Sequence, residues 1–196
     1  MGSSDKVVSR IAARVKALES NFDNHLKVFT ESNRFTGPSW YFHNKTIELS
    51  TNAPSIKDLF NNDCFFEYLY ATLTSWGLHR MGPGNTKLRE LDDIKESLKL
   101  QLPAISELSK ASLSQLPKQN VKEVAGRAWE VMSGLKVSIA EAQIVANSKA
   151  LHHVIPRLIA PIDREYTFKF FYSRKNLSIP EEHAFIEMFT AMADMH

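Results

Sequence analysis

The residues best suited to chemistry lie close together in the segment 148–164. The segment holds six charged or ionisable side chains in an otherwise apolar run: Lys149, His152, His153, Arg157, Asp163 and Arg164. Pro156 and Pro161 interrupt the run, and proline ends one helix or begins the next. We therefore expect these side chains to gather where two helix ends meet, an arrangement that can position a catalytic or binding group.

The cations of this segment have two interpretations. Lys149, His152 and His153 are three and four residues apart, so they share one side of the last turns of a helix. There a cation gains about 0.3–1 kcal/mol from the helix dipole, which makes an ordinary helix end the first interpretation. The second is a basic surface for phosphates that also includes Arg157, Arg164 and Lys169. Residues 136–175 contain seven Lys or Arg and three Asp or Glu, a local charge of +4.

Asp163 is the carboxylate most suited to a special role. Its position after Pro161 predicts the N-cap of the next helix, where its side chain would bind backbone N–H groups. The alternative is a catalytic acid or base, paired with His152 or His153. A second candidate site is the glycine-rich break after Trp76, where His79 and Arg80 either cap a helix or contact a ligand.

Neither a metal nor a cofactor is predicted. The seven histidines show no spacing typical of a metal site, and the single cysteine, Cys64, cannot build a zinc centre. A single cysteine also suits a reducing cytoplasm, and we expect Cys64 to be buried beside Phe65 and Phe66. The chain lacks an apolar run of about 18 residues, so we expect no membrane-spanning helix.

Hydrophobic periodicity predicts one all-α domain over residues 1–196. The expected elements are a long helix over 4–32, an irregular region over 33–54 with a small β-hairpin near 35–50, and a helical core over 55–196. They amount to seven or eight helices, and the last is still periodic at His196, which suggests a continuation or an exposed tail. The apolar seam of the first helix favours packing on the core, and the alternative is a homodimer through it.

Residues 120–172 resemble the helix-hairpin-helix DNA glycosylase superfamily and its bacterial relatives. The likeness rests on Ser133-Gly134-Leu135 before a helix, on Ser148-Lys149 within it, and on a proline-containing loop that leads to Asp163. The resemblance implies a role for Asp163 at the start of a helix. The glycine-rich hairpin is reduced here to Gly134, and Lys149 lies closer to Asp163 in sequence than the superfamily's catalytic lysine would.

These observations favour a cytoplasmic, bacterial-type helical binding module without enzymatic activity. Nucleic acid is its expected ligand, contacted through the basic helix junction at 149–169. Two alternatives stay open: an interaction or oligomeric scaffold built on the N-terminal helix, and an enzyme that uses Asp163 with His152 or His153. The overall charge of +2 is well below that of a dedicated nucleic-acid binder, so only the local +4 supports the first hypothesis.

Overall fold

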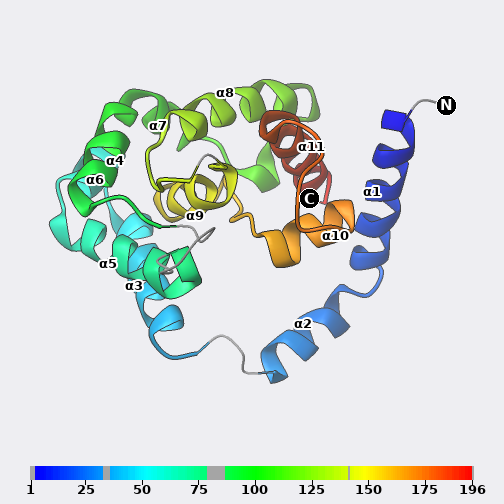
Figure 1. Cartoon of the computed structure of the whole chain (residues 1–196), viewed down its shortest axis with the longest axis horizontal. Coiled ribbons are helices and arrows are strands. Elements are labelled where there is room, and N and C mark those ends of the chain that lie inside the picture. Colours follow the sequence, from blue (N-terminus) through cyan, green and yellow to red (C-terminus); the bar gives the residue numbers. More distant parts are fainter. Residues whose placement is uncertain (1–2, 33–35, 79–86, 141, 196) are drawn as a thin grey trace.

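The protein is an assembly of helices around one central helix (Figure 1). A computed structural model describes residues 3–32, 36–78, 87–140 and 142–195. This part of the chain forms eleven α-helices and no strand, and its one β-type contact is an isolated bridge between Leu88 and Ser138. The helices are α1 (Ser3–Glu19), α2 (Phe22–Glu31), α3 (Pro38–Asn52), α4 (Ile56–Phe60), α5 (Asp63–Leu73), α6 (Leu91–Leu100), α7 (Leu102–Leu108), α8 (Val121–Gly134), α9 (Ile144–Val154), α10 (Lys169–Tyr172) and α11 (Glu181–Asp194).

The all-α prediction is confirmed. More helices form than the seven or eight expected, in part because the predicted helix over 4–32 is divided in two and the region of the predicted hairpin is helical. Four short turns complete the described part, two of the 3-10 type, η2 (Leu113–Gln115) and η3 (Lys118–Asn120), and two of the π type, η1 (Thr74–Leu78) and η4 (Arg164–Phe168). None of the described helices combines the length and apolar character needed to cross a bilayer.

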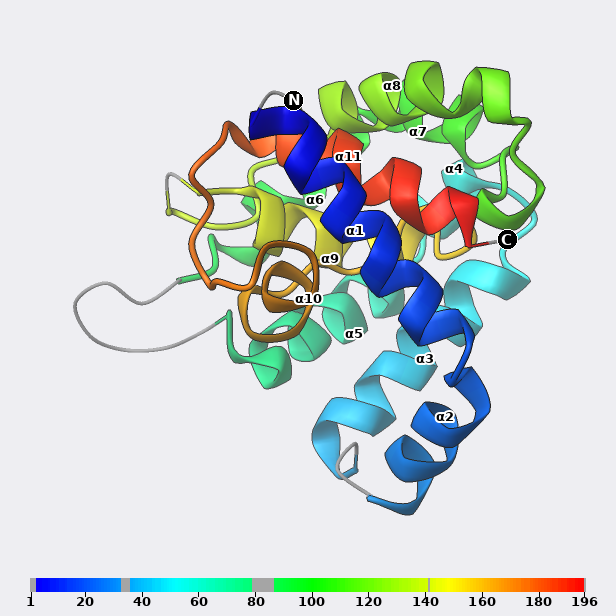
Figure 2. The same ribbon diagram turned by 90° about the vertical axis from the view of Figure 1, so that its right-hand side faces the viewer.

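The predicted helix over 4–32 is wrong as a single element, because α1 ends at Glu19 and α2 begins at Phe22. At the break between them, the Ser20 hydroxyl donates to the carbonyl of Ala17. Ile11 and Val15 of α1 are buried, and α1 lies along α11 and α10. In contrast, α2 has no buried residue. Only the first half of the predicted apolar seam therefore packs on the core (Figure 2).

The predicted β-hairpin near 35–50 is also wrong, because this region forms α3. Gly37 has a positive φ of 66° and Pro38 occupies the first turn, a combination that begins a helix. Thr46 is fully buried, and its hydroxyl lies 3.0 Å from that of Thr72 on α5. The alternation of polar and apolar residues around Thr46 therefore does not mark a strand. It includes one threonine that faces inward where α3 packs along α5.

The core is built on α5 and α9. Four large apolar side chains of α5 are at most 1 % exposed: Phe65, Phe66, Leu69 and Leu73. Cys64, expected to be buried, is exposed instead. Helix α9 occupies the middle of the molecule and contacts α3, α5 and α8 (Figure 1). Nine of its eleven residues are buried.

Helix α9 begins at Ile144, after a segment whose described residues form no regular helix. Ser138 is buried in the isolated bridge with Leu88, and Glu141 lies outside the described residues. At the start of α9, the N–H groups of Gln143 and Ile144 donate to one carboxylate oxygen of Glu181 on α11, at 3.0 and 3.1 Å. This bond joins the start of the central helix to the start of the last one.

Candidate functional site

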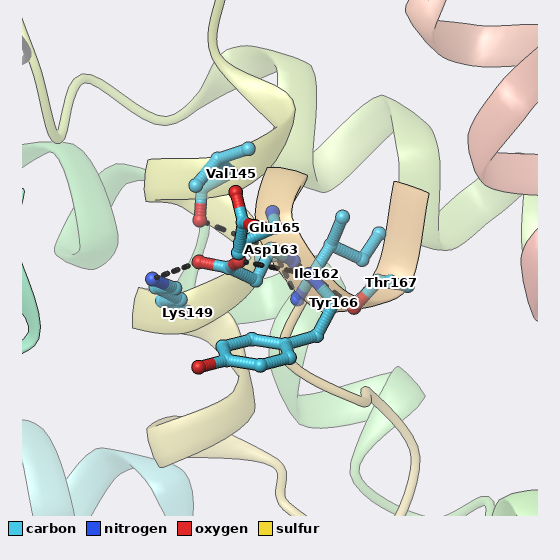
Figure 3. A network of polar contacts seen from close by, with 8 residues as sticks. Val145, Lys149, Ile162, Asp163, Glu165, Tyr166 and Thr167 are labelled. Carbon is cyan, nitrogen blue, oxygen red and sulfur yellow. Dashed lines mark hydrogen bonds and ion pairs between the residues drawn. The ribbon is translucent and has the colours of Figure 1, made fainter. Parts of the chain in front are cut away.

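The candidate site is a lysine that α9 holds inside the protein. The side chain of Lys149 is only 8 % exposed, and its amine lies 3.2 Å from a carboxylate oxygen of Asp163 (Figure 3). The amine also lies 5.7 Å from the centre of the Trp76 ring, a distance at which a cation is attracted to an indole face. Removing a charged amine from water is costly, so the two partners are what keep this position tenable.

Asp163 serves the lysine and the backbone at once. One of its carboxylate oxygens faces Lys149, and the other accepts the N–H groups of Glu165 and Tyr166 at 2.6 and 3.3 Å. The prediction that Asp163 caps a helix is therefore confirmed, although the helical turn that it caps is η4, a π turn. Its carbonyl accepts the N–H of Phe168 five residues later. The side chain of Asp163 is 35 % exposed, so it forms the solvent side of the pair.

Ser148 fixes the distance between the lysine and the aspartate. Its hydroxyl accepts the N–H of Ile162 at 3.0 Å and donates to the carbonyl of Val145. Ser148 and Lys149 on α9 therefore bind consecutive residues of the loop that follows, Ile162 and Asp163. Two contacts therefore join α9 to this loop, the Ser148–Ile162 hydrogen bond and the Lys149–Asp163 ion pair. Together they give the ion pair a defined geometry.

Three histidines lie on the inner side of this pair. His153 is fully buried, and burial lowers its pKa to about 3, helped by the nearby His152. Burial also lowers the pKa of His43 and of His152. Because His153 is uncharged at neutral pH, its Nδ1–H donates to the carbonyl of Lys149 at 2.7 Å. Its Nε2 then accepts the Nδ1–H of His43 at 3.0 Å.

Aromatic ring contacts extend from these histidines to α3 and η1. The rings of His43 and His152 are nearly parallel, with centres 6.1 Å apart, and Trp76 lies 5.0 Å from His153. His152 donates its Nδ1–H to the carbonyl of Ile159 at 2.7 Å. Each bond that the structure gives to His152 or His153 thus goes to a group other than Asp163, whose partner is Lys149.

The remaining predicted contacts are spread over the surface. Arg157, Arg164 and Lys169 are exposed, and Lys169 forms an ion pair with Glu165. His79 and Arg80 lie outside the described residues. Of the predicted site, the structure brings together Lys149, His152, His153 and Asp163 and leaves the three exposed cations around them. The basic groups nearest to the junction are therefore not one continuous phosphate surface.

His43 and Trp76 belong to the site, but the sequence did not indicate them. His43 lies 110 residues from His153 in the chain, inside the region expected to form a hairpin. A helix over 38–52 would have placed His43 and Thr46 one turn apart on a face turned inward. Within the described residues, no group of three His, Cys, Asp or Glu side chains is placed to hold a metal ion.

Comparisons with protein-family models, with curated proteins and with solved structures found no match to this chain. The function must therefore be argued from the geometry. The arrangement offers one amine with an adjacent proton acceptor and a set of uncharged imidazoles. A lysine amine in such surroundings can act as a nucleophile toward an electrophilic carbon, provided that a neighbouring base takes its proton.

Proposed function

We propose that this protein is an enzyme that acts on nucleic acid through the amine of Lys149. The observation that carries the proposal is the 3.2 Å contact between this amine and Asp163 inside a buried helix. A buried ion pair is a poor source of stability, since apolar side chains in its place often stabilise a fold equally well or better. The pair is thus better explained by chemistry than by folding.

The choice of nucleic acid follows from the resemblance to the helix-hairpin-helix DNA glycosylases. In that superfamily a lysine on the hairpin's second helix acts together with an aspartate that begins the next helix. Lys149 and Asp163 are only 14 residues apart in the chain, yet their side chains meet. We therefore assign Lys149 the position of that lysine, with a shorter connection between the two residues than the superfamily has.

The reaction needs only Lys149, Asp163 and water. Asp163 takes one proton from the Lys149 ammonium, and the freed lone pair attacks C1′ of a deoxyribose. At a nucleotide, the electrons of the glycosidic bond leave with the base, which takes a proton from water. At an abasic site, C1′ is an aldehyde, and the attack ends in an imine with loss of water. The target nucleotide must leave the base stack to reach the amine.

Substrate approaches from the side of Asp163, the more exposed member of the pair. Tyr166, three residues further on, is 75 % exposed and its ring lies beside the pair (Figure 3). Arg164 and Arg174 are exposed in the same stretch and can contact individual phosphates. The aromatic ring offers a surface on which a displaced base can stack.

The proposal places the protein in a reducing compartment. The only cysteine of the chain is Cys64, so no disulfide can form within it. In a bacterial cell the cytoplasm is such a compartment, and it also contains the DNA on which the enzyme would act.

The experiment is borohydride trapping on a duplex oligonucleotide that contains one abasic site. Borohydride reduces an imine to a stable amine, so a protein that forms one remains joined to the DNA. We expect a cross-linked band for the natural protein and none for Lys149→Met. Lys110→Met is the matched control, because Lys110 is an exposed lysine paired with Glu107 on α7, and this variant should trap normally.

Binding is measured on the same duplexes by fluorescence anisotropy at several salt concentrations. Salt-dependent binding without trapping would overturn the amine chemistry and leave the binding module that the sequence favoured. Absence of both binding and trapping at about 10 μM protein would overturn the nucleic-acid proposal as a whole.

As a second function, we propose a homodimer through the N-terminal helices. The observation in its favour is α2, which has an apolar side and no buried residue. Monomeric proteins rarely leave such a surface uncovered. Size-exclusion chromatography with light scattering tests this, and a strict monomer at about 200 μM would overturn it, because functional dimers are tighter than that.

A further inference from the structure

The apolar side of α2 is an exposed stripe that none of the residues described by the structure covers. Phe22, Leu26 and Phe29 follow one another at spacings of four and three residues, so they lie on one side of the helix. They are 54, 51 and 61 % exposed. Three large apolar anchors at this spacing are typical of a helix that lies in a groove of a partner.

The same chain has an apolar groove beside α1. The groove has a volume of about 660 Å³ and lies between α1, α8 and α11. Its apolar lining comes from Ile11, Ala12, Val15, Ile186 and Ala191. This volume lies within the range of specific binding sites. The groove also contains the buried hydroxyl of Thr190, which has no hydrogen-bond partner.

The edge of the groove suits one edge of the stripe in charge. Two lysines, Lys16 and Lys122, line the groove together with three acids, Glu19, Glu187 and Asp194. On α2 the stripe is flanked by the carboxylate of Asp23 on one side and by His25 on the other. An α2 helix in the groove can therefore place Asp23 next to one of these lysines.

An α2 helix cannot reach the groove of its own chain. It follows α1 after two residues and continues beyond the C-terminal end of α1, away from the groove that α1 forms with α11 (Figures 1 and 2). In a second copy related by a two-fold axis perpendicular to α1, the two α1 helices run antiparallel. Each α2 then leads toward the groove of the other molecule.

We propose that α2 of each copy lies in the α1–α8–α11 groove of a second copy, which closes a two-fold dimer by helix exchange. This inference rests on the homodimer proposed above and adds how it is built. Exchange of an identical element is a low-cost route to a dimer, and it satisfies both copies, so growth stops at two. The exchange uses the stripe and the groove together, whereas pairing of two α2 helices would leave both grooves empty.

The test uses one variant on each surface. Phe29→Glu places a charge on the stripe, and Ala12→Glu places one in the groove without touching α2. Sedimentation velocity should show at least tenfold weaker dimerisation for each variant, since a charge buried without a partner costs well over 1.4 kcal/mol. Asn24→Glu adds the same charge on the opposite side of α2 and should dimerise as the natural chain does.

Mixing the two variants gives the sharpest result. The Phe29→Glu copy retains its groove and the Ala12→Glu copy retains its α2, so one exchange contact survives in the mixed pair. The mixture should therefore dimerise more strongly than either variant alone.

The other outcomes separate the two ideas. Loss of the dimer with Phe29→Glu but not with Ala12→Glu overturns the exchange and keeps a dimer through α2. A natural chain that stays monomeric, or a dimer that neither variant weakens, overturns the exchange and the N-terminal dimer together.

Discussion

Replacing Lys149 should cost the fold far less than replacing its partner Asp163. Lys149→Met keeps the length of the side chain and its apolar packing but removes the charge. The carboxylate that remains is one-third exposed, so water solvates it, and it still accepts the two N–H groups of η4. Exchange of a buried ionic group for an apolar one is often neutral or stabilising. We expect the free energy of unfolding to stay within about 1 kcal/mol of the natural value or to rise.

Asp163→Ala has the opposite effect. It removes an N-cap, which costs about 1 kcal/mol, and it leaves a buried amine without its carboxylate. Loss of one partner of a buried pair costs roughly 3–5 kcal/mol, and the exposure of Asp163 places this case at the lower end. The total is about 4 kcal/mol, and Asp163→Asn, which keeps an oxygen for the cap, should lose about 3.

Urea unfolding at pH 7, followed by circular dichroism, measures these differences at an unchanged m value. The double variant Lys149→Met/Asp163→Ala completes the comparison. It should recover most of the loss, because no buried amine remains to be solvated, and only the cost of the cap persists. A Lys149→Met protein that loses more stability than Asp163→Ala would refute this reasoning. Lys149 would then be a structural residue, and the amine chemistry would lose its main support.

Three further predictions concern the surroundings of the site and the surface. Stability should decrease as the pH falls from about 6.5 toward 3, by up to ~1.4 kcal/mol per pH unit for His153, and His153→Gln should flatten this dependence. Stability is lost toward low pH because the unfolded histidine gains a proton near pH 6.5, whereas the folded one stays uncharged. Urea titrations from pH 7 to 5 measure this loss. Asn147→Leu should cost about 2–3 kcal/mol in thermal or urea unfolding, because its amide donates to the carbonyls of Met132 and Leu135 at the end of α8. Cys64 should react fully with a thiol reagent in the native protein, and protection until unfolding would contradict its exposure.

The helices could be predicted from the sequence where an apolar period is long and bounded by breaks. α5, α6, α8 and α11 follow this rule. The rule failed at α3, where aromatic residues and an alternating stretch at Lys45–Leu49 imitate a strand. It failed also near Ser20, where one periodic pattern is divided into two helices. Local patterns do not contain the information needed here, because the inward face of α3 is determined by its contact with α5.

The position of the site was predictable, but its character was not. The prolines indicated that Lys149 and Asp163 lie where two helix ends meet, and the structure places their side chains 3.2 Å apart. Counting charges then suggested an exposed basic surface. Burial depends on which helices surround α9, and two of its neighbours, α3 and α5, lie far from it in the sequence. For that reason the amine of Lys149, which was expected at a helix end, is enclosed by neighbouring helices.

Two breaks in helical structure bring the aromatic and the acidic partner to this amine. Trp76 lies in η1, where Gly77 adopts a φ of 80° and kinks the chain, and Asp163 caps the π turn η4. A π turn is less favourable than continued α-helix and is frequent at functional sites. Together with the cost of burying Lys149, this turn indicates that the fold gives up stability to hold the amine beside Trp76 and Asp163.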